Sequence, residues 1–189
     1  MQVYNTEYRI KSFDVDFKKE IKLSRLFHIL QEASSQHASI LDFGYQNLKN
    51  NNQFWVLARM EADFLRFPIW DEEIKIKTWH KGARRFFAYR DFQIFSSKGD
   101  NLINATSSWL VVDMDTKRPV RISKQFNNYD SKIEQDALLA DLNKLHIPAN
   151  INLKDKRSVK YSDIDLNGHV NNAKYLEWLT CVCHRRPHA

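Results

Sequence analysis

The sequence predicts an α+β fold in which an antiparallel sheet wraps one long helix, and in which a second, similar unit begins near the C-terminus. Three observations carry this prediction: an apolar stripe at helical spacing, a series of strand-like runs after it, and a short internal repeat. The chain has 189 residues, 43% of them hydrophobic and 13% aromatic, which suffices for a packed core and excludes a disordered chain.

The helix is predicted from apolar residues that recur every three or four positions. It follows a strand expected within residues 4–17 and runs from about Ser24 to Phe43. Ser24 is a suitable N-cap residue, and Gly44 is a suitable terminator. His37 lies on the apolar stripe, where we expect it to pack and to find a hydrogen-bond partner rather than to catalyse. The stripe consists of Leu23, Leu26, Phe27, Leu30, Ala33, His37 and Leu41.

Four strand-like runs follow the helix, at residues 54–65, 73–79, 85–95 and 102–112. The second run alternates, with Ile74, Ile76 and Thr78 on the face that we expect to be buried. Turn residues separate the runs at Lys81-Gly82 and at 97–100. A long helix wrapped by such an antiparallel meander is the hot-dog fold.

After the last strand the composition becomes polar, and the chain then repeats its own beginning. Residues 123–154 are predicted to be a linker, with a short helical pattern at 136–145. Beyond it, Asp14-Val15-Asp16-Phe17 recurs as Asp163-Ile164-Asp165-Leu166, an offset of 163 − 14 = 149 residues. In each copy a strand is expected to lead into an amphipathic helix.

The repeat predicts a tandem hot-dog with an incomplete second module. The first module would occupy residues 1–122 and the second would begin at residues 155–189. Because the second module is expected to hold only one strand and one helix, we interpret the chain as C-terminally truncated. We therefore expect the segment from about Asp155 onward to be mobile or to pack irregularly, and the open sheet edge of the first module to favour a homodimer.

The second copy carries chemical groups that the first copy lacks. The first copy has Lys18 and Glu20 where the second has Asn167 and His169, next to Asp165. A histidine can act as a base, the aspartate can orient it or can itself activate water or attack, and the asparagine can hold a carbonyl or a water. Backbone N–H groups at the helix start can stabilise an oxyanion; they belong to Val170, Asn171 and Asn172. The alternative is a plain polar turn whose Asp and Asn side chains only cap backbone groups.

The pattern Asp-x-Asn-x-His-Val-Asn-Asn-x-Lys-Tyr, which runs from Asp165 to Tyr175, resembles the motif that opens the second hot-dog module of acyl-ACP thioesterases. The resemblance extends over roughly residues 4–178. Its other matches are Gln31-Glu32-Ala33, His37-Ala38, Trp55 to Arg59, Thr78-Trp79, Arg90-Asp91-Phe92, Ser108-Trp109 and Arg118-Pro119.

This resemblance implies a hydrolase that releases free fatty acid from acyl carrier protein in fatty acid biosynthesis. The first module would bind the acyl chain, and the second would catalyse through Asp165, Asn167 and His169, with a further acid or cysteine on a later strand. No cofactor or metal is implied, because a thioester is already activated. Two alternatives are an acyl-CoA thioesterase and an inactive, acyl-binding truncated hot-dog protein.

The charge, the cysteines and the apolar runs of the sequence limit the classes of partner, metal and location that we expect. The net charge is +6, but the basic residues are interleaved with acids and form no block, which argues against nucleic acid and suits an acidic protein such as a carrier. The two cysteines, Cys181 and Cys183, lack zinc-ligand spacing. The sequence contains no signal-like or membrane-length apolar run, so we expect a cytoplasmic protein without a membrane span.

Overall fold

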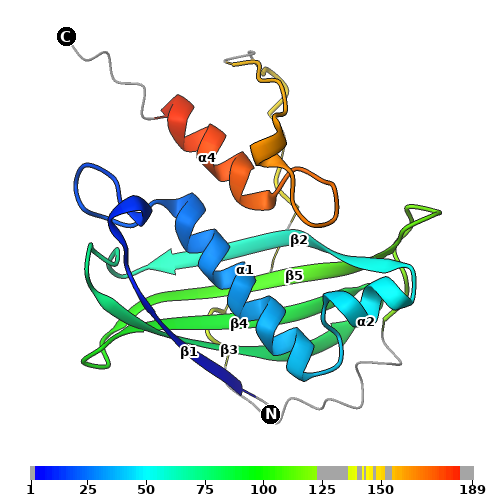
Figure 1. Ribbon diagram of the computed structural model, residues 1–189, viewed down its shortest axis with the longest axis horizontal. Helices are drawn as coiled ribbons and strands as arrows, with labels where there is room; N and C mark the ends of the chain where they lie inside the picture. The colour runs from blue at the N-terminus through cyan, green and yellow to red at the C-terminus, as the bar shows by residue number, and fades with distance from the viewer. Residues whose placement is uncertain are drawn as a thin grey trace.

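The computed structural model describes residues 3–122, 136–139, 142, 144–146, 148–151 and 155–183. Five strands form one antiparallel sheet in the order β1-β3-β4-β5-β2, and helix α1 (Leu23–Ile40) lies across one face of it (Figure 1). The strands are β1 (Val3–Arg9), β2 (Gln53–Phe64), β3 (Glu73–Arg84), β4 (Phe87–Ser96) and β5 (Asn101–Asp113). The predicted α+β class, with a long helix on an antiparallel sheet, is confirmed.

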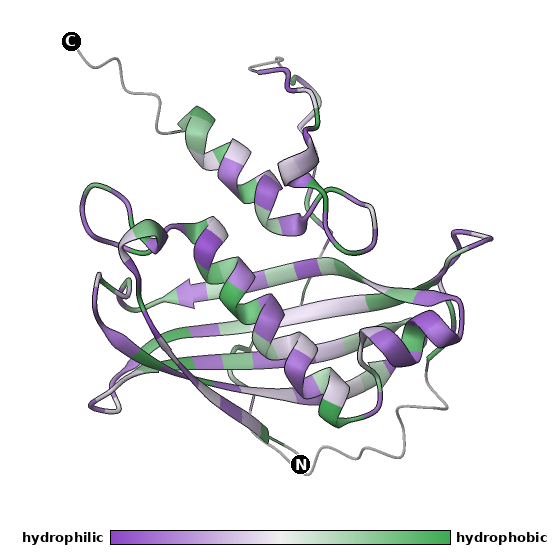
Figure 2. Ribbon diagram, viewed as in Figure 1, coloured by the Kyte–Doolittle hydropathy of each residue, from purple (hydrophilic) through white to green (hydrophobic). Residues whose placement is uncertain are grey.

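The main core lies between α1 and this sheet. Helix α1 is amphipathic, with apolar and polar residues alternating along it in Figure 2. Its buried residues Leu26, Leu30 and Ala33 pack in one cluster with sheet residues such as Ile74 and Phe92. Burial of a side chain such as leucine is worth about 1.5–3 kcal/mol, so this layer holds the helix on the sheet.

Helix α1 ends earlier than predicted. It stops at Ile40, and Gly44 instead precedes a second, short helix, α2 (Tyr45–Asn50). A Cβ on Gly44 would lie only 2.8 Å from the Cα of Ser39, so the reversal of the chain there needs a glycine. The predicted cap was also wrong, because Lys22 occupies the N-cap position and Ser24 is buried inside the helix.

The turn predicted at Lys81-Gly82 is a bulge inside a longer strand. β3 continues to Arg84, and its register with β4 shifts between His80 and Gly82. Gly82 has a φ of +107°, a conformation that a glycine adopts readily and that bulges often require. The chain reverses after it at Arg85, which has a φ of 58°.

Both faces of β3 are covered near the end of the strand. The face predicted to be buried is buried, with Ile74 and Thr78 each 0% exposed, but Trp79 on the opposite face is only 2% exposed. Asp91, the partner of Trp79 in the ladder, accepts a hydrogen bond from Ala137 N–H at 2.8 Å. Part of the linker therefore lies on the sheet face away from α1.

Two further bonds fix the linker there. Lys81 forms ion pairs with both Asp91 and Asp136, and Arg59 donates to the backbone carbonyl of Leu142 at 3.1 Å. The helical pattern predicted for 136–145 is wrong for the described residues of that range, none of which is helical. Their backbone groups bond to the sheet instead, as the Ala137 and Leu142 contacts show.

The second unit contains the 3-10 turn η2 (Tyr161–Asp163) and helix α4 (Asn172–Cys183). The strand expected before them is absent from residues 155–160, all of which the structure describes. The irregular packing expected from Asp155 onward is also contradicted, because α4 is a regular helix that packs against α1 (Figure 1). The remaining residues, 184–189, lie outside the described residues. In the part of the chain that the structure describes, no helix is long and apolar enough to span a bilayer.

Candidate active site between the two repeats

The internal repeat is reproduced in the backbone. We name the two copies the Asp16 turn (residues 14–22) and the Asp165 turn (residues 163–171). The N–H of Asp16 bonds to the carbonyl of Glu20 at 2.9 Å, and the N–H of Asp165 bonds to that of His169 at 2.8 Å. Isolated β-bridges join Val15 to Ile21 and Ile164 to Val170, again 149 residues apart.

One carboxylate organises each turn. Oδ1 of Asp165 accepts from the N–H groups of Asn167 at 2.8 Å and His169 at 3.2 Å. Oδ1 of Asp16 accepts from the N–H groups two and four residues on at the same two distances. This is the polar-turn role left open by the sequence, and it is common to both copies. Any difference in chemistry between the copies must therefore come from the positions of Asn167 and His169.

A second carboxylate ties each turn to the helix that follows it. Asp14 is fully buried and pairs with Arg25 at 2.7 Å, and Asp163 pairs with Lys174 at 3.6 Å. Burial of Asp14 opposes its ionisation, but hydrogen bonds from the Lys11 N–H, from Tyr8 and from Arg25 outweigh it and lower the pKa of Asp14. The first anchor is the shorter and the more buried of the two.

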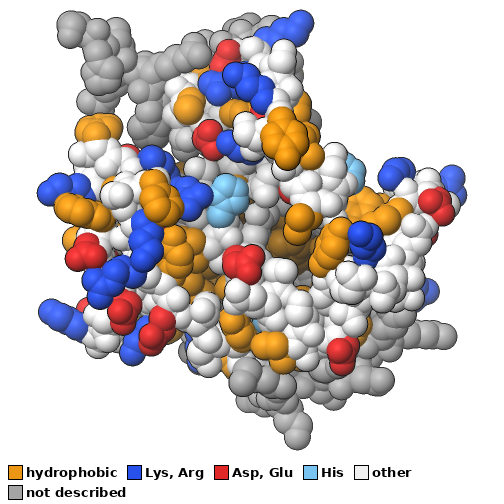
Figure 3. Space-filling view, in the orientation of Figure 1, with side chains coloured by type: hydrophobic (Ala, Val, Ile, Leu, Met, Phe, Trp, Pro, Cys, Tyr) orange, Lys and Arg blue, Asp and Glu red, His pale blue; other side chains and the backbone are white. Residues whose placement is uncertain are grey.

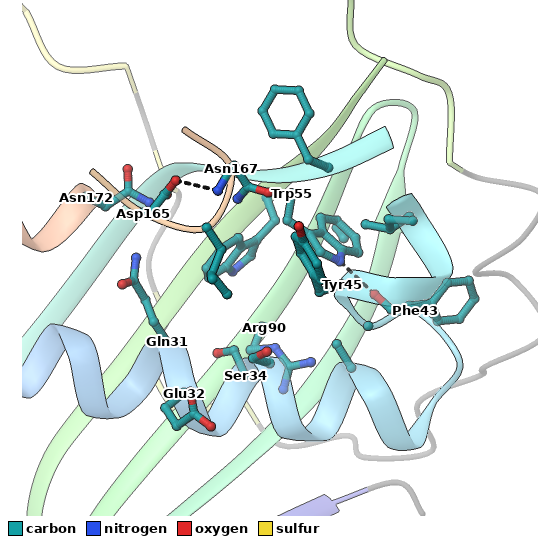
Figure 4. Close-up of a pocket in the computed structure, with 18 of the residues that line it drawn as sticks. Gln31, Glu32, Ser34, Phe43, Tyr45, Trp55, Arg90, Asp165, Asn167 and Asn172 are labelled. Atoms are coloured by element: carbon teal, nitrogen blue, oxygen red, sulfur yellow. Dashed lines mark hydrogen bonds between the residues drawn. The ribbon is translucent and has the colours of Figure 1, made fainter. Parts of the chain in front are cut away.

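The Asp165 turn closes one side of a cavity of about 500 Å³. Helix α1, the connection to α2 with α2 itself, the sheet and the start of α4 form the rest of its wall, and Figure 3 shows a hollow with hydrophobic side chains on this face. Trp55 Nε1 donates to the Phe43 carbonyl at 2.9 Å and so holds the α1–α2 connection against β2 (Figure 4). The apolar wall consists of Ala38, Leu41, Phe43, Leu48, Phe54, Trp55, Ala88 and Trp109.

Four of the six predicted site residues reach this cavity. Asp165 and Asn167 line it from the turn, and Gln31 lies across from them on α1 (Figure 4). Asn171 and Asn172 line it from the start of α4, and Oδ1 of Asn171 caps that helix by accepting from Ala173 N–H at 2.9 Å. Oδ1 of Asn167 is buried without a hydrogen-bond partner among the described residues, so this acceptor is still available to a donor.

The other two predicted residues do not line the cavity. His169 is exposed, and its ring stacks on Phe54 with the ring centroids 5.0 Å apart and an interplanar angle of 20°. Val170 forms the bridge to Ile164. The structure thus brings the aspartate and the asparagine together in the cavity and leaves the histidine ring beside its wall.

His28 is a cavity residue that sequence reasoning missed. It lies on α1 and lines the cavity. Burial lowers the pKa of His28, and the neighbouring cations Arg25 and Lys174 lower it further, against weaker opposing effects of Glu177 and Asn171. The imidazole is therefore neutral at pH 7. No sequence signal marked it, because its surroundings are built from both repeats.

Comparison with known sequences settles the family. The profile of the acyl-ACP thioesterase N-terminal domain matches residues 1–129, and that of the acyl-ACP thioesterase C-terminal domain matches residues 148–185. The chain belongs to the acyl-ACP thioesterase family. An acyl-ACP thioesterase from Bacteroides thetaiotaomicron has a similar structure, with 26% sequence identity and a TM-score of 0.74 over 95% of this chain and 73% of that one. Such neighbours are hot-dog thioesterases, which confirms the hot-dog fold.

Two plant family members show how the lengths compare. Oleoyl-acyl carrier protein thioesterases of Coriandrum sativum and Arabidopsis thaliana are 26% and 27% identical to this chain over 93% of its length. The matched region is 52% of the first relative and 53% of the second. The chain thus spans about half the length of the plant relatives it matches.

Proposed function

We propose that this protein hydrolyses the thioester of fatty acyl carrier protein and releases the free fatty acid during fatty acid biosynthesis. The observation that carries the proposal is the shared cavity, into which Asp165 and Asn167 extend beside an apolar wall. Polar groups converging at one side of an apolar pocket are typical of a substrate site. Family membership supplies the substrate class.

The proposed chemistry takes place at the Asp165 turn. Asn167 would hold the thioester carbonyl through its side-chain amide, and the N–H groups at the start of α4 would stabilise the oxyanion. Water adds to the carbonyl carbon, the carbon–sulfur bond breaks, and the thiol leaves with the proton that the base took from water. The proposed reaction needs no cofactor, because a thioester is already an activated acyl group.

The base is proposed to be His169, oriented by Asp165. Because Oδ1 of Asp165 already holds the turn, only Oδ2 remains for a catalytic bond. The His169 ring would have to leave Phe54 to reach the cavity, and both groups lie on the same short turn. If the ring stays on Phe54, Asp165 is the group placed to activate water directly.

The first module is proposed to bind the acyl chain between α1 and the sheet. Each buried methylene contributes about 0.8 kcal/mol, so the depth of this cavity would control chain length. The carrier protein is the proposed partner, and a net charge of +6 favours an acidic one. A cytoplasmic location remains a prediction, since the plant relatives are named as chloroplastic.

Steady-state hydrolysis of matched acyl-ACP and acyl-CoA tests the proposal. We expect faster hydrolysis of acyl-ACP, with a rate that falls as salt screens the attraction between the two proteins. Equal, salt-insensitive rates would move the assignment to acyl-CoA thioesterase. Tight acyl binding without turnover would support the non-enzymatic alternative.

Self-association is a further part of the proposal. Among the strands that the structure describes, β2 is an edge strand that pairs with β5 alone, and Phe17 on the Asp16 turn is 88% exposed. Exposed sheet edges and apolar side chains recruit other chains. Light scattering is expected to show a symmetric dimer. A monomer at all accessible concentrations would contradict this expectation.

A further inference from the structure

The acyl cavity contains a buried cation. Arg90 extends from β4 toward α1, lines the cavity and is only 8% exposed. Figure 4 shows it beside Ser34, farther along α1 than Gln31. Burial lowers the pKa of Arg90 to about 10, so the guanidinium is still charged at neutral pH. An apolar acyl site would be expected to lack such a group.

Most donors of this guanidinium are unused. Nη1 bonds to His37 Nδ1 at 2.9 Å and to Thr78 Oγ1 at 3.1 Å. Within the described residues, the Arg90 guanidinium makes no other hydrogen bond and no ion pair. Neither partner is anionic, and Asp91 points to the opposite face, where it pairs with Lys81. A buried charge without a counter-charge is costly unless a ligand supplies acceptors.

Among the described residues, the two acids that line the cavity do not supply this counter-charge. Glu32 is exposed and accepts from Gln36 at 2.8 Å, and Asp165 holds its own turn. Neighbouring His80, whose pKa burial and the charge of Arg90 lower to about 4, is neutral at pH 7. The charge of Arg90 is therefore directed at the cavity rather than at a protein carboxylate.

Ser34 completes a pair of complementary groups. It is 7% exposed, lines the cavity and donates its hydroxyl hydrogen to the Leu30 carbonyl at 2.8 Å. Its oxygen is therefore left as an acceptor at a cavity that Arg90, which can only donate, also lines. A ligand hydroxyl can accept from the guanidinium and donate to the serine, whereas a methylene can do neither.

We propose that Arg90 and Ser34 form a subsite for an oxygen carried on the acyl chain, so that the preferred substrate is a hydroxylated acyl thioester. This inference rests on the proposed use of the cavity for the acyl chain. Ser34 follows Gln31 by three residues, or about 4.5 Å along the helix. The oxygen would therefore lie several bonds from the carbonyl that Asn167 holds.

Binding of non-hydrolysable analogues tests the subsite without relying on turnover. The probes are acyl-pantetheines in which an amide replaces the thioester, all of one chain length, with a hydroxyl moved carbon by carbon from position 3, together with the unsubstituted chain. Calorimetric titration of the protein is expected to show one position that binds about tenfold tighter than its isomers, the effect of a hydrogen bond to a charged donor. A keto group at that position, which only accepts, should bind with intermediate affinity.

Two variants locate the effect. Arg90→Met removes the donors and is expected to abolish the preference among isomers while keeping affinity for the unsubstituted chain. Ser34→Val leaves Arg90 in place and blocks access to it, so it should also abolish the preference. This second variant keeps the test decisive if Arg90→Met does not fold.

Three results would count against the subsite. Equal binding of all isomers by the unmodified protein, or a preference that survives in a folded variant, would overturn it and leave the proposed function intact. Failure of every analogue to bind would instead overturn the use of the cavity for acyl chains, and with it both proposals.

Discussion

The Asp16 turn and the Asp165 turn have the same backbone and different surroundings. Each has a carboxylate that accepts from the N–H groups two and four residues on, and each ends in a helix. The Asp165 turn lies against the other module and lines a cavity, whereas Phe17 of the Asp16 turn is exposed. The comparison teaches that Asp165 would be needed in this turn even without catalysis.

The largest expected effect comes from exchanging the residues at one position of the two turns. Asn167→Lys installs the residue that the Asp16 turn carries as Lys18, so the turn should still form. Loss of a carbonyl-binding amide is expected to reduce kcat for acyl-ACP hydrolysis by about two to three orders of magnitude. The reverse exchange, Lys18→Asn, is the matched control and should leave kcat unchanged. Comparable losses in both variants would mean that the two turns do not differ in function.

The second prediction compares His169 with Glu20, which occupies the same position in the Asp16 turn. His169→Ala is expected to lower the rate of the chemical step by about two orders of magnitude, the usual contribution of a general base. Glu20→Ala should not change it. Single-turnover measurement with acyl-ACP reports this step directly. A His169→Ala enzyme with full activity would show that the ring remains on Phe54 during the reaction and that Asp165 activates the water.

The anchoring carboxylates should differ in their contribution to stability. Asp14→Asn is expected to lower the free energy of unfolding by about 1–3 kcal/mol, because Asp14 is buried and hydrogen-bonded. Asp163→Asn should cost less, since its ion pair is longer. Urea denaturation of both variants measures the difference. Equal losses would indicate that the burial of Asp14 does not matter.

Acid unfolding provides a second measure of the same anchor. The pKa of Asp14 is lower in the folded protein than in the unfolded chain, where it is about 3.9. Its stabilising effect is therefore fully present above that value and is lost as pH falls through the folded pKa. The unfolding free energy of Asp14→Asn should depend less steeply on pH in this acid range. An unchanged slope would contradict the assignment.

The smallest expected effect concerns the residue with positive φ in each turn. Gly168 has a φ of 74° and Lys19 a φ of 66°, both in the left-handed region. Gly168→Ala should destabilise the protein by about 1 kcal/mol, whereas Lys19→Gly should be close to neutral, because relief of strain offsets the added chain entropy. Thermal unfolding monitored by circular dichroism would check both. A stabilising Gly168→Ala would show that the turn adopts another conformation.

The sequence predicted the layers and the repeat better than the boundaries. Spacing of apolar residues identified α1 and four strands, and the motif at Asp165 located the turn now seen in the cavity. The predicted end of α1 was wrong. The chain reverses where Gly44 lies against Ser39, and the spacing of apolar residues does not indicate this contact. The strand extension at Gly82 was missed because a bulge and a turn use the same residue type.

The candidate site was predictable only in part. Asp165 and Asn167 follow from the motif, but Arg90 and His28 become cavity residues only when α1, the sheet and the Asp165 turn come together. Arg90 belongs to a motif that the sequence matches. The motif does not show, however, that the guanidinium is buried in the cavity without a counter-charge. The position of the His169 ring depends on Phe54, which lies more than a hundred residues away in the chain.

The linker serves as a tether between the first module and helix α4. Its attachment to the back of the sheet shortens the free chain that α4 must search from. Helix α4 has a single fully buried residue, Ala173, while Tyr175 and Leu179 are more than half exposed, so its own packing is weak. The bond from Ala137 to Asp91 places the start of that tether on the first module. A flexible tether can give an effective concentration on the order of millimolar, and at that value a helix with millimolar affinity would still occupy its place about half the time. The same helix supplied as a separate peptide would dissociate at micromolar concentrations, and the cavity would lose the wall that carries its polar groups.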